Sequence, residues 1–133
     1  MVWPSLHLIS LWTFDCRRQD SSSFQTFKCC LEVLQNIQCD FFVLENVDLE
    51  ESENSDGANN LELILKGLDD AGYQTKCYKL ISSDFSVPQR RVRLYFLGFH
   101  RTKQPQVTFD MVDQNLELFR STPLHPDIQI QFD

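Results

Sequence analysis

Basic residues are scarce in this chain relative to acidic ones. The 133 residues include 12 lysines and arginines against 19 aspartates and glutamates, so the net charge is −7. A protein that binds nucleic acid by itself normally presents a basic face, because contacts to phosphates supply most of its non-specific affinity. The overall charge therefore argues against DNA binding by this chain alone, although three arginines gather at Arg90, Arg91 and Arg93.

The cysteines lack the spacing of a metal site or of a disulfide framework. There are 5 of them, an odd number, and no two form a Cys-x-x-Cys pair. The 3 histidines lie far from them in sequence, so we predict no metal site. We interpret the cysteines as reduced thiols of an intracellular protein, mostly buried as small apolar groups.

The chain also lacks a recognisable membrane or secretion signal. Its apolar opening, residues 1–12, is too short to cross a bilayer and has neither a basic start nor a small-residue cleavage site. Hydrophobic residues make up 42% of the chain and charged residues 23%, which is typical of a globular protein. The length allows one domain or a part of one.

Two segments carry apolar residues at helical spacing. The first follows Ser21, Ser22 and Ser23, whose hydroxyls suit the capping of a helix start. Its apolar residues recur three or four positions apart, which predicts a helix over residues 22–37: Phe24, Phe27, Leu31, Leu34 and Ile37. The second segment begins at Asn60 and ends at Ala71-Gly72, as helices often end.

Short apolar runs follow these helices. Residues 40–44 form a continuous run directly after the first helix, which is typical of a buried strand in a parallel sheet. Residues 73–80 and 92–97 predict two further strands. The pattern predicts an α/β sheet with helices packed on it. We expect three parts: residues 1–20 as an irregular N-terminal segment, residues 21–100 as the α/β unit and residues 101–133 as an irregular C-terminal tail.

Two motifs carry chemistry. Glu45-Asn46-Val47 places a carboxylate and an amide at the carboxyl end of a buried strand, where open α/β sheets form their ligand sites. Pro88-Gln89-Arg90-Arg91-Val92-Arg93 leads into the last apolar strand. In an extended strand Gln89, Arg91 and Arg93 point the same way, because side chains alternate with period two.

These two motifs in this order resemble the DNA (cytosine-5) methyltransferase family. The flanking segments 69–73 and 80–88 are also similar to that family, and the likeness covers about residues 20–100. It implies part of the Rossmann-like sheet of an S-adenosylmethionine-dependent methyltransferase, with the first strands missing. The implied activity is transfer of a methyl group from S-adenosylmethionine to cytosine C5 in DNA, in the nucleus if the organism is eukaryotic.

The resemblance also implies roles for four residues. Cytosine C5 becomes nucleophilic when a thiolate adds to C6 and a proton is supplied at N3. A buried carboxylic acid can hold that proton and accept from the exocyclic amine, and Glu45 takes this role with Asn46 helping to position it. Arg93 would contact the oxygen at C2, and Arg91 would hold the nucleophile loop. The target base must be flipped out of the duplex. The alternative is that Glu45 forms only a structural ion pair with one of these arginines.

Several parts of the family pattern are absent from this sequence. It contains no Pro-Cys-Gln nucleophile segment, and the nearest candidate, Trp3-Pro4-Ser5-Leu6, has serine in place of cysteine. The flanks of Cys16 do not match the motif either. The cofactor turn of the family is rich in glycine, whereas this chain has 4 glycines and none before Gly57. No target-recognition region is evident.

We therefore expect an incomplete copy that is inactive alone, binds S-adenosylmethionine poorly if at all, and binds DNA weakly or not at all. An alternative is a non-catalytic interaction module that docks on a full-length methyltransferase. A third hypothesis is a plain α/β domain in which the motifs are coincidental.

Overall fold

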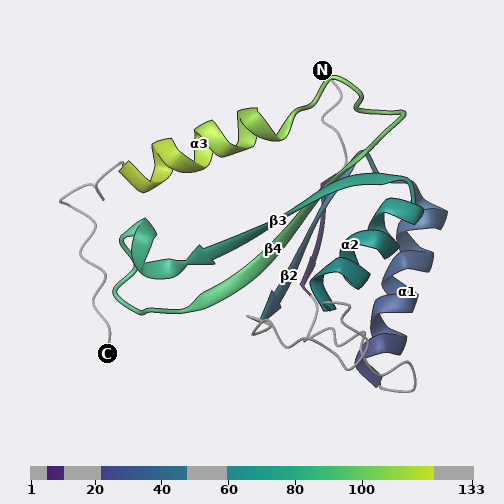
Figure 1. Ribbon diagram of the computed structural model, residues 1–133, viewed down its shortest axis with the longest axis horizontal. Coiled ribbons are helices and arrows are strands. Elements are labelled where there is room, and N and C mark those ends of the chain that lie inside the picture. The colour runs from purple at the N-terminus through teal and green to yellow at the C-terminus, as the bar shows by residue number, and fades with distance from the viewer. Residues whose placement is uncertain (1–5, 11–21, 48–59, 122–133) are drawn as a thin grey trace.

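The computed structural model describes residues 6–10, 22–47 and 60–121 (Figure 1). Along the chain the elements are β1 (Leu6–Ser10), α1 (Ser22–Ile37), β2 (Phe41–Val47), α2 (Asn60–Asp70), β3 (Tyr73–Ile81), the short 3-10 helix η1 (Ser82–Phe85), β4 (Val92–His100) and α3 (Phe109–Ser121). The two helices and three strands expected between residues 22 and 100 are all confirmed. Among the helices described here, none combines the length and the apolar character that a bilayer crossing requires.

The four strands form one mixed sheet in the order β1-β2-β4-β3. Strands β1 and β2 are parallel, as expected for a strand in a parallel sheet, whereas β4 runs antiparallel to both β2 and β3. The reversal at β4 follows from the connection after β3: residues 82–91 are too few for a crossover, so the chain returns as a hairpin. The predicted α/β class is confirmed.

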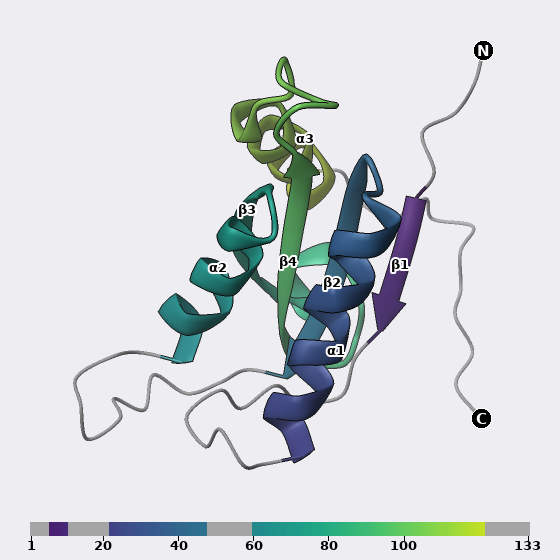
Figure 2. The same ribbon diagram turned by 90° about the vertical axis from the view of Figure 1, so that its right-hand side faces the viewer.

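Helices α1 and α2 lie side by side on one face of the sheet, which we call the core face (Figure 2). Alternate residues of β2 and β4 point into this layer, as the period of two requires. The buried apolar residues are Phe27, Cys30, Leu34, Cys39, Phe42, Leu44, Ile64, Leu68, Tyr73, Leu94 and Phe96. The second motif residue of β2, Asn46, is also on this face and is 1% exposed.

Tyr73 ties the start of β3 to the end of α1. Its hydroxyl lies 3.2 Å from the carbonyl oxygens of Leu34 and Cys39, to which it donates, and 3.4 Å from Cys39 Sγ. Burial, followed by the contacts with Cys39, raises the pKa of Tyr73 above its ordinary value. The ring stacks edge-on against Phe42, with centroids 5.0 Å apart. This residue therefore fixes where α1 ends relative to the sheet.

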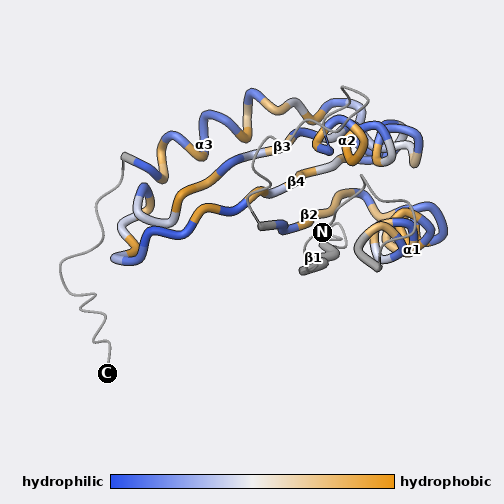
Figure 3. Tube along the Cα trace, turned by 60° about the horizontal axis from the view of Figure 1, so that its bottom comes forward, coloured by the Kyte–Doolittle hydropathy of each residue, from blue (hydrophilic) through white to orange (hydrophobic). Residues whose placement is uncertain are grey.

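Helix α3 lies on the opposite face, which we call the open face. Phe109 packs on Phe99, with ring centroids 5.6 Å apart. Asp113 accepts hydrogen bonds from Lys76 Nζ at 2.7 Å and from the Tyr78 hydroxyl at 2.9 Å. Figure 3 shows hydrophilic and hydrophobic residues alternating along this helix, and three of its apolar residues stay exposed: Met111, Leu118 and Phe119.

The structure corrects two of the expectations for the ends of the chain. Residues 109–121 are helical, so the prediction of an irregular tail over 101–133 is wrong there. Residues 6–10 form a strand, so the prediction of an irregular segment over 1–20 is wrong for those five residues. Both elements depend on partners distant in sequence, because α3 contacts β3 and β1 pairs with β2. Such tertiary contacts supply most of the stability of a short element, and local patterns do not reveal them.

Candidate functional site

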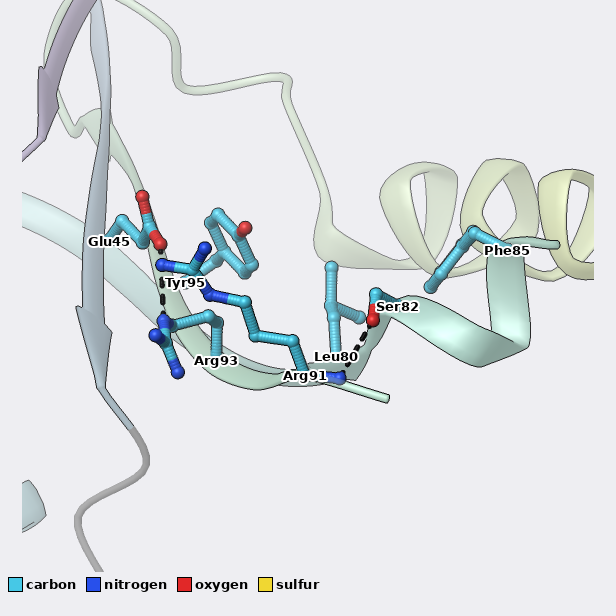
Figure 4. A pocket seen from close by; sticks show the side chains of 7 residues that line it. All are labelled: Glu45, Leu80, Ser82, Phe85, Arg91, Arg93 and Tyr95. Carbon is cyan, nitrogen blue, oxygen red and sulfur yellow. Dashed lines mark hydrogen bonds and ion pairs between the residues drawn. The ribbon is translucent and has the colours of Figure 1, made fainter. Parts of the chain in front are cut away.

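An open pocket lies where the carboxyl end of β2 meets the hairpin between β3 and β4 (Figure 4). Its volume is about 240 Å³, and it is lined by Glu45, Leu80, Ser82, Phe85, Arg91, Arg93 and Tyr95. Sites for drug-sized ligands span roughly 300–1,000 Å³, so this pocket suits a smaller ligand such as a single nucleobase.

Strand register explains why these residues converge. Glu45 pairs with Tyr95 across β2 and β4, and Leu80 pairs with Arg93 across β3 and β4. Residues directly opposite each other in an antiparallel pair point to the same face of the sheet. Glu45, Arg93, Tyr95 and Leu80 therefore all lie on the open face, away from α1 and α2.

Glu45 and Arg93 form an ion pair inside the pocket. Arg93 Nε lies 3.5 Å from Glu45 Oε1, and the two side chains are 24% and 30% exposed respectively. Arg93 Nη1 also donates to the carbonyl oxygen of Val92 at 2.7 Å, which holds the guanidinium in place. A partly exposed pair such as this contributes only about 0–1 kcal/mol to stability. The pair therefore does little for the fold and instead presents an acceptor and a donor side by side.

The four residues singled out from the motifs occupy different places. Glu45, Arg91 and Arg93 line the pocket, and Figure 4 shows the Arg91 side chain extending from the hairpin toward Glu45 and Tyr95. Asn46 does not line it, because the pleat turns this side chain to the core face. Arg90 is exposed and does not line the pocket. Ser5 and Cys16, the weak nucleophile candidates, lie outside the described residues.

Sequence reasoning missed four of the lining residues. Tyr95 follows Arg93 by two positions, so the period of a strand could have found it. Leu80 required the pairing of β3 with β4. Ser82 and Phe85 belong to η1, and nothing in the local sequence indicates that this turn folds back on the pocket.

Two thiols on the described part of the chain are poor nucleophiles. Burial, with a smaller contribution from Cys39, raises the pKa of Cys30 to about 11, and burial raises the pKa of Cys77 to about 11. A thiol must ionise to attack, so neither would act near neutral pH. Within residues 6–10, 22–47 and 60–121 there is also no cluster of three potential metal ligands.

The pocket does not fit S-adenosylmethionine. Two guanidinium groups, those of Arg91 and Arg93, face it against the single carboxylate of Glu45. The sulfonium centre of that cofactor carries a positive charge, and like charges at close range repel. The described residues of this pocket therefore suit a neutral base with mixed donors and acceptors better than they suit the cofactor.

Comparison with known proteins agrees with the motifs. The sequence model of the family C-5 cytosine-specific DNA methylase matches residues 13–129, which is most of the chain. The chain is 39% identical over 83 residues to the type II methyltransferase M1.HphI of Haemophilus parahaemolyticus, covering 62% of this chain and 21% of that protein. It is 40% identical over 58 residues to the type II methyltransferase M.NlaX of Neisseria lactamica, covering 44% and 18% respectively. The chain thus spans about a fifth of the length of these relatives.

Solved structures show the same relationship. The S. pombe Dnmt2 methyltransferase superposes with a TM-score of 0.58 at 25% identity, covering 96% of this chain and 39% of that one. A putative DNA modification methyltransferase encoded within an E. coli prophage shares the fold, with a TM-score of 0.56 at 20% identity, over 77% of this chain and 29% of that one. The resemblance seen in the motifs is therefore confirmed, and the chain belongs to the C-5 cytosine-specific DNA methylase family, whose members are S-adenosylmethionine-dependent methyltransferases.

Proposed function

We propose that the pocket around Glu45 receives the target cytosine of DNA (cytosine-5) methylation. The observation that carries this is the pairing of Glu45 with Arg93 at 3.5 Å in a pocket of about 240 Å³. Cytosine presents an exocyclic amine and the ring atom N3 beside a carbonyl oxygen. A carboxyl group next to a guanidinium group matches that edge, because one binds the amine and N3 while the other donates to the oxygen.

Each pocket residue then has a separate task. Glu45 binds the amine and holds a proton at N3, which draws electrons away from the ring as the reaction proceeds. Arg93 donates to the oxygen at C2, where negative charge develops. Arg91 reaches in from the hairpin (Figure 4), where in the family it would hold the nucleophile segment that this sequence lacks. Asn46, buried on the core face, steadies the end of β2 and so acts on the base only through the position of Glu45.

The 133 residues alone supply this pocket without supplying methyl transfer. Their sequence contains no Pro-Cys-Gln and no glycine before Gly57, and the Cys30 and Cys77 thiols stay protonated at neutral pH. When bound in the family's cofactor site, S-adenosylmethionine supplies the methyl group, and here we assign no residue to it. With a net charge of −7, the chain should bind duplex DNA weakly. Incubation with tritiated S-adenosylmethionine and plasmid DNA should give only background incorporation.

The pocket itself can be tested with a nucleoside. In a titration of the labelled 133-residue chain followed by ¹H–¹⁵N NMR, 2′-deoxycytidine should shift the amides of Glu45, Arg93 and Tyr95 with a millimolar dissociation constant. Thymidine should bind less well, because it offers an oxygen where deoxycytidine offers an amine. Glu45→Gln should reduce this discrimination. Equal binding of the two nucleosides to the unaltered chain would sink the proposal.

A second candidate function is docking on a full-length cytosine-5 methyltransferase. The open face carries apolar residues that are only half-buried, including Phe41, Val43 and Leu97. The chain also spans about a fifth of the length of these relatives. Co-elution with a full-length relative in size-exclusion chromatography would support this role, and Glu45→Gln should leave that co-elution intact.

A further inference from the structure

We propose that Ser82 is a positioning residue for the arginines of the pocket. Its hydroxyl closes the base of the hairpin between β3 and β4, so that Arg91 and Arg93 are held facing Glu45. The inference rests on the proposed function for its significance in catalysis, but the positioning itself is a property of the chain that can be measured without a ligand.

Ser82 lies where the chain leaves β3 and turns into η1. The β3–β4 ladder ends at the pair Ile81–Val92, and Ser82 stands opposite Arg91 one step beyond it. Its backbone N–H donates to the carbonyl oxygen of Arg91 at 3.0 Å, which continues the ladder on one side. Its own carbonyl oxygen instead turns into the 3-10 helix, where it accepts from the N–H of Val87 at 3.3 Å.

The side chain of Ser82 compensates for that turn. In a regular antiparallel pair the N–H of Arg91 would donate to the Ser82 carbonyl oxygen, which here faces away. The Ser82 hydroxyl takes its place and accepts from Arg91 N–H at 2.8 Å, as the dashed line in Figure 4 marks. The same hydroxyl donates its proton to the carbonyl oxygen of Gln89. One side chain thus binds the returning strand at two points.

These bonds control the direction of both arginines. Ser82 is hydrogen-bonded to the backbone of Arg91 itself. Arg93 lies two positions later and points to the same face of the strand. The far side of the loop is supported separately, because the guanidinium of Arg120 on α3 lies 5.7 Å from the centroid of the Phe85 ring. Ser82 therefore holds the base of the hairpin through Arg91, and α3 supports its 3-10 turn through the contact of Arg120 with Phe85. Alanine at position 82 could neither accept from Arg91 nor donate to Gln89.

The test compares Ser82→Ala and Ser82→Thr with the unaltered chain. Ser83→Ala is the matched control, since Ser83 is the exposed neighbour and contributes its backbone oxygen to the turn. Three quantities are measured by NMR: amide hydrogen exchange at Arg91, the Nε–H resonance of Arg93 and the dissociation constant of 2′-deoxycytidine. Ser82→Ala should speed Arg91 exchange at least about tenfold, shift the Arg93 resonance toward that of a free side chain and weaken nucleoside binding about three- to tenfold.

Ser82→Thr keeps the hydroxyl and should restore all three readouts, and Ser83→Ala should leave them unchanged. An Arg93 resonance that is the same in Ser82→Ala and in the unaltered chain would overturn the inference. So would an Arg91 amide in the unaltered chain that exchanges as fast as in an unstructured peptide, a result that needs no variant to fold. If the unaltered chain binds no deoxycytidine, the proposed function fails, whereas the exchange and Arg93 measurements still decide the role of Ser82.

Discussion

Glu45 on β2 and Arg93 on β4 meet at 3.5 Å on the open face of the sheet, although they lie 48 positions apart in the sequence. Their strands place them there, since Val47 is paired with Arg93 and Glu45 with Tyr95 in the antiparallel register. The pair is too exposed to contribute much to folding. The pair matters for ligand binding, because it places the carboxylate of Glu45 beside the N–H donors of the Arg93 guanidinium at the edge of a small pocket.

Arg93→Lys should weaken deoxycytidine binding about threefold to tenfold, because lysine keeps the charge but loses the planar fork that can bind Glu45 and the base together. The free energy of unfolding should change by less than about 0.5 kcal/mol, as expected for a partly exposed ion pair. Nucleoside titration and urea unfolding measure the two effects. Arg90→Lys, at an exposed residue that does not line the pocket, is the control and should alter neither. A large loss of stability in Arg93→Lys would favour the alternative hypothesis that the Glu45–Arg93 ion pair is only structural.

Gly98→Ala should destabilise the fold by about 1–3 kcal/mol, because overpacking a well-filled core has a cost of that order. A Cβ atom at this position would lie 2.3 Å from the ring of Phe42, which is fully buried between the sheet and the helices. Gly67→Ala is the comparison: its nearest contacts, at 3.1 Å, are side chains of Leu31 and Phe27 that can adjust, and alanine favours a helix. Urea unfolding should show a much smaller loss for Gly67→Ala, and equal losses would contradict this view of the core.

Helix α3 should stay packed on β3 from about pH 5 to pH 9, because over this range Asp113 stays ionised and Tyr78 stays protonated. The hydrogen bond from Lys76, followed by that from Tyr78, lowers the pKa of Asp113, so its contribution is present above the ordinary aspartate range and is lost only as pH falls through the depressed value. Burial, followed by the bond to Asp113, raises the pKa of Tyr78, so its contribution is lost only at pH above the ordinary tyrosine range.

The resonances of Phe109 and Tyr78 followed against pH measure this docking. Asp113→Asn removes the carboxylate and should loosen α3 at neutral pH, whereas Asp110→Asn, one turn earlier on an exposed position, should not. A docking transition with a midpoint between pH 5 and pH 9 in the unaltered chain would show that other groups hold the helix.

Cys29 should react with a thiol reagent before the other cysteines of the described segments. It is exposed, whereas Cys30 and Cys39 are buried and the pKa of Cys30 is raised to about 11. At pH 8 the buried thiols should react only as fast as the chain opens. Mass spectrometry of peptides after brief labelling identifies the modified sites, and a Cys16→Ser background removes the cysteine outside these segments. Rapid labelling of Cys30 would mean that α1 does not pack as described.

The sequence predicts those elements whose evidence is local. Helix α1 was expected at residues 22–37 and is found there, because the spacing of Phe27 and Leu34 records the face that it buries. Helix α3 was missed because its decisive contacts join Asp113 to Lys76 and Tyr78, which lie 35 or more positions earlier. Strand β1 was missed for the same reason, since its pairing with β2 crosses a whole helix.

The residues of the pocket could likewise be predicted only in part. Glu45, Arg91 and Arg93 were expected together from two motifs, and the register brings them to one pocket. Asn46 is adjacent in sequence but faces the core, as strand alternation requires. Ser82 could not have been found from the sequence, because its role arises only where the backbone leaves β3 and one carbonyl turns away from the ladder.

We propose above that Glu45 binds the amine of a cytosine and holds a proton at N3. The most direct measurement is the ¹⁵N shift of N3 in labelled 2′-deoxycytidine, free and bound to the 133-residue chain. On binding, the shift should move toward that of the N3-protonated base in the unaltered chain, and much less in Glu45→Gln. If deoxycytidine binds and the N3 shift does not move, or moves equally in Glu45→Gln, Glu45 does not serve the base and its pairing with Arg93 is structural.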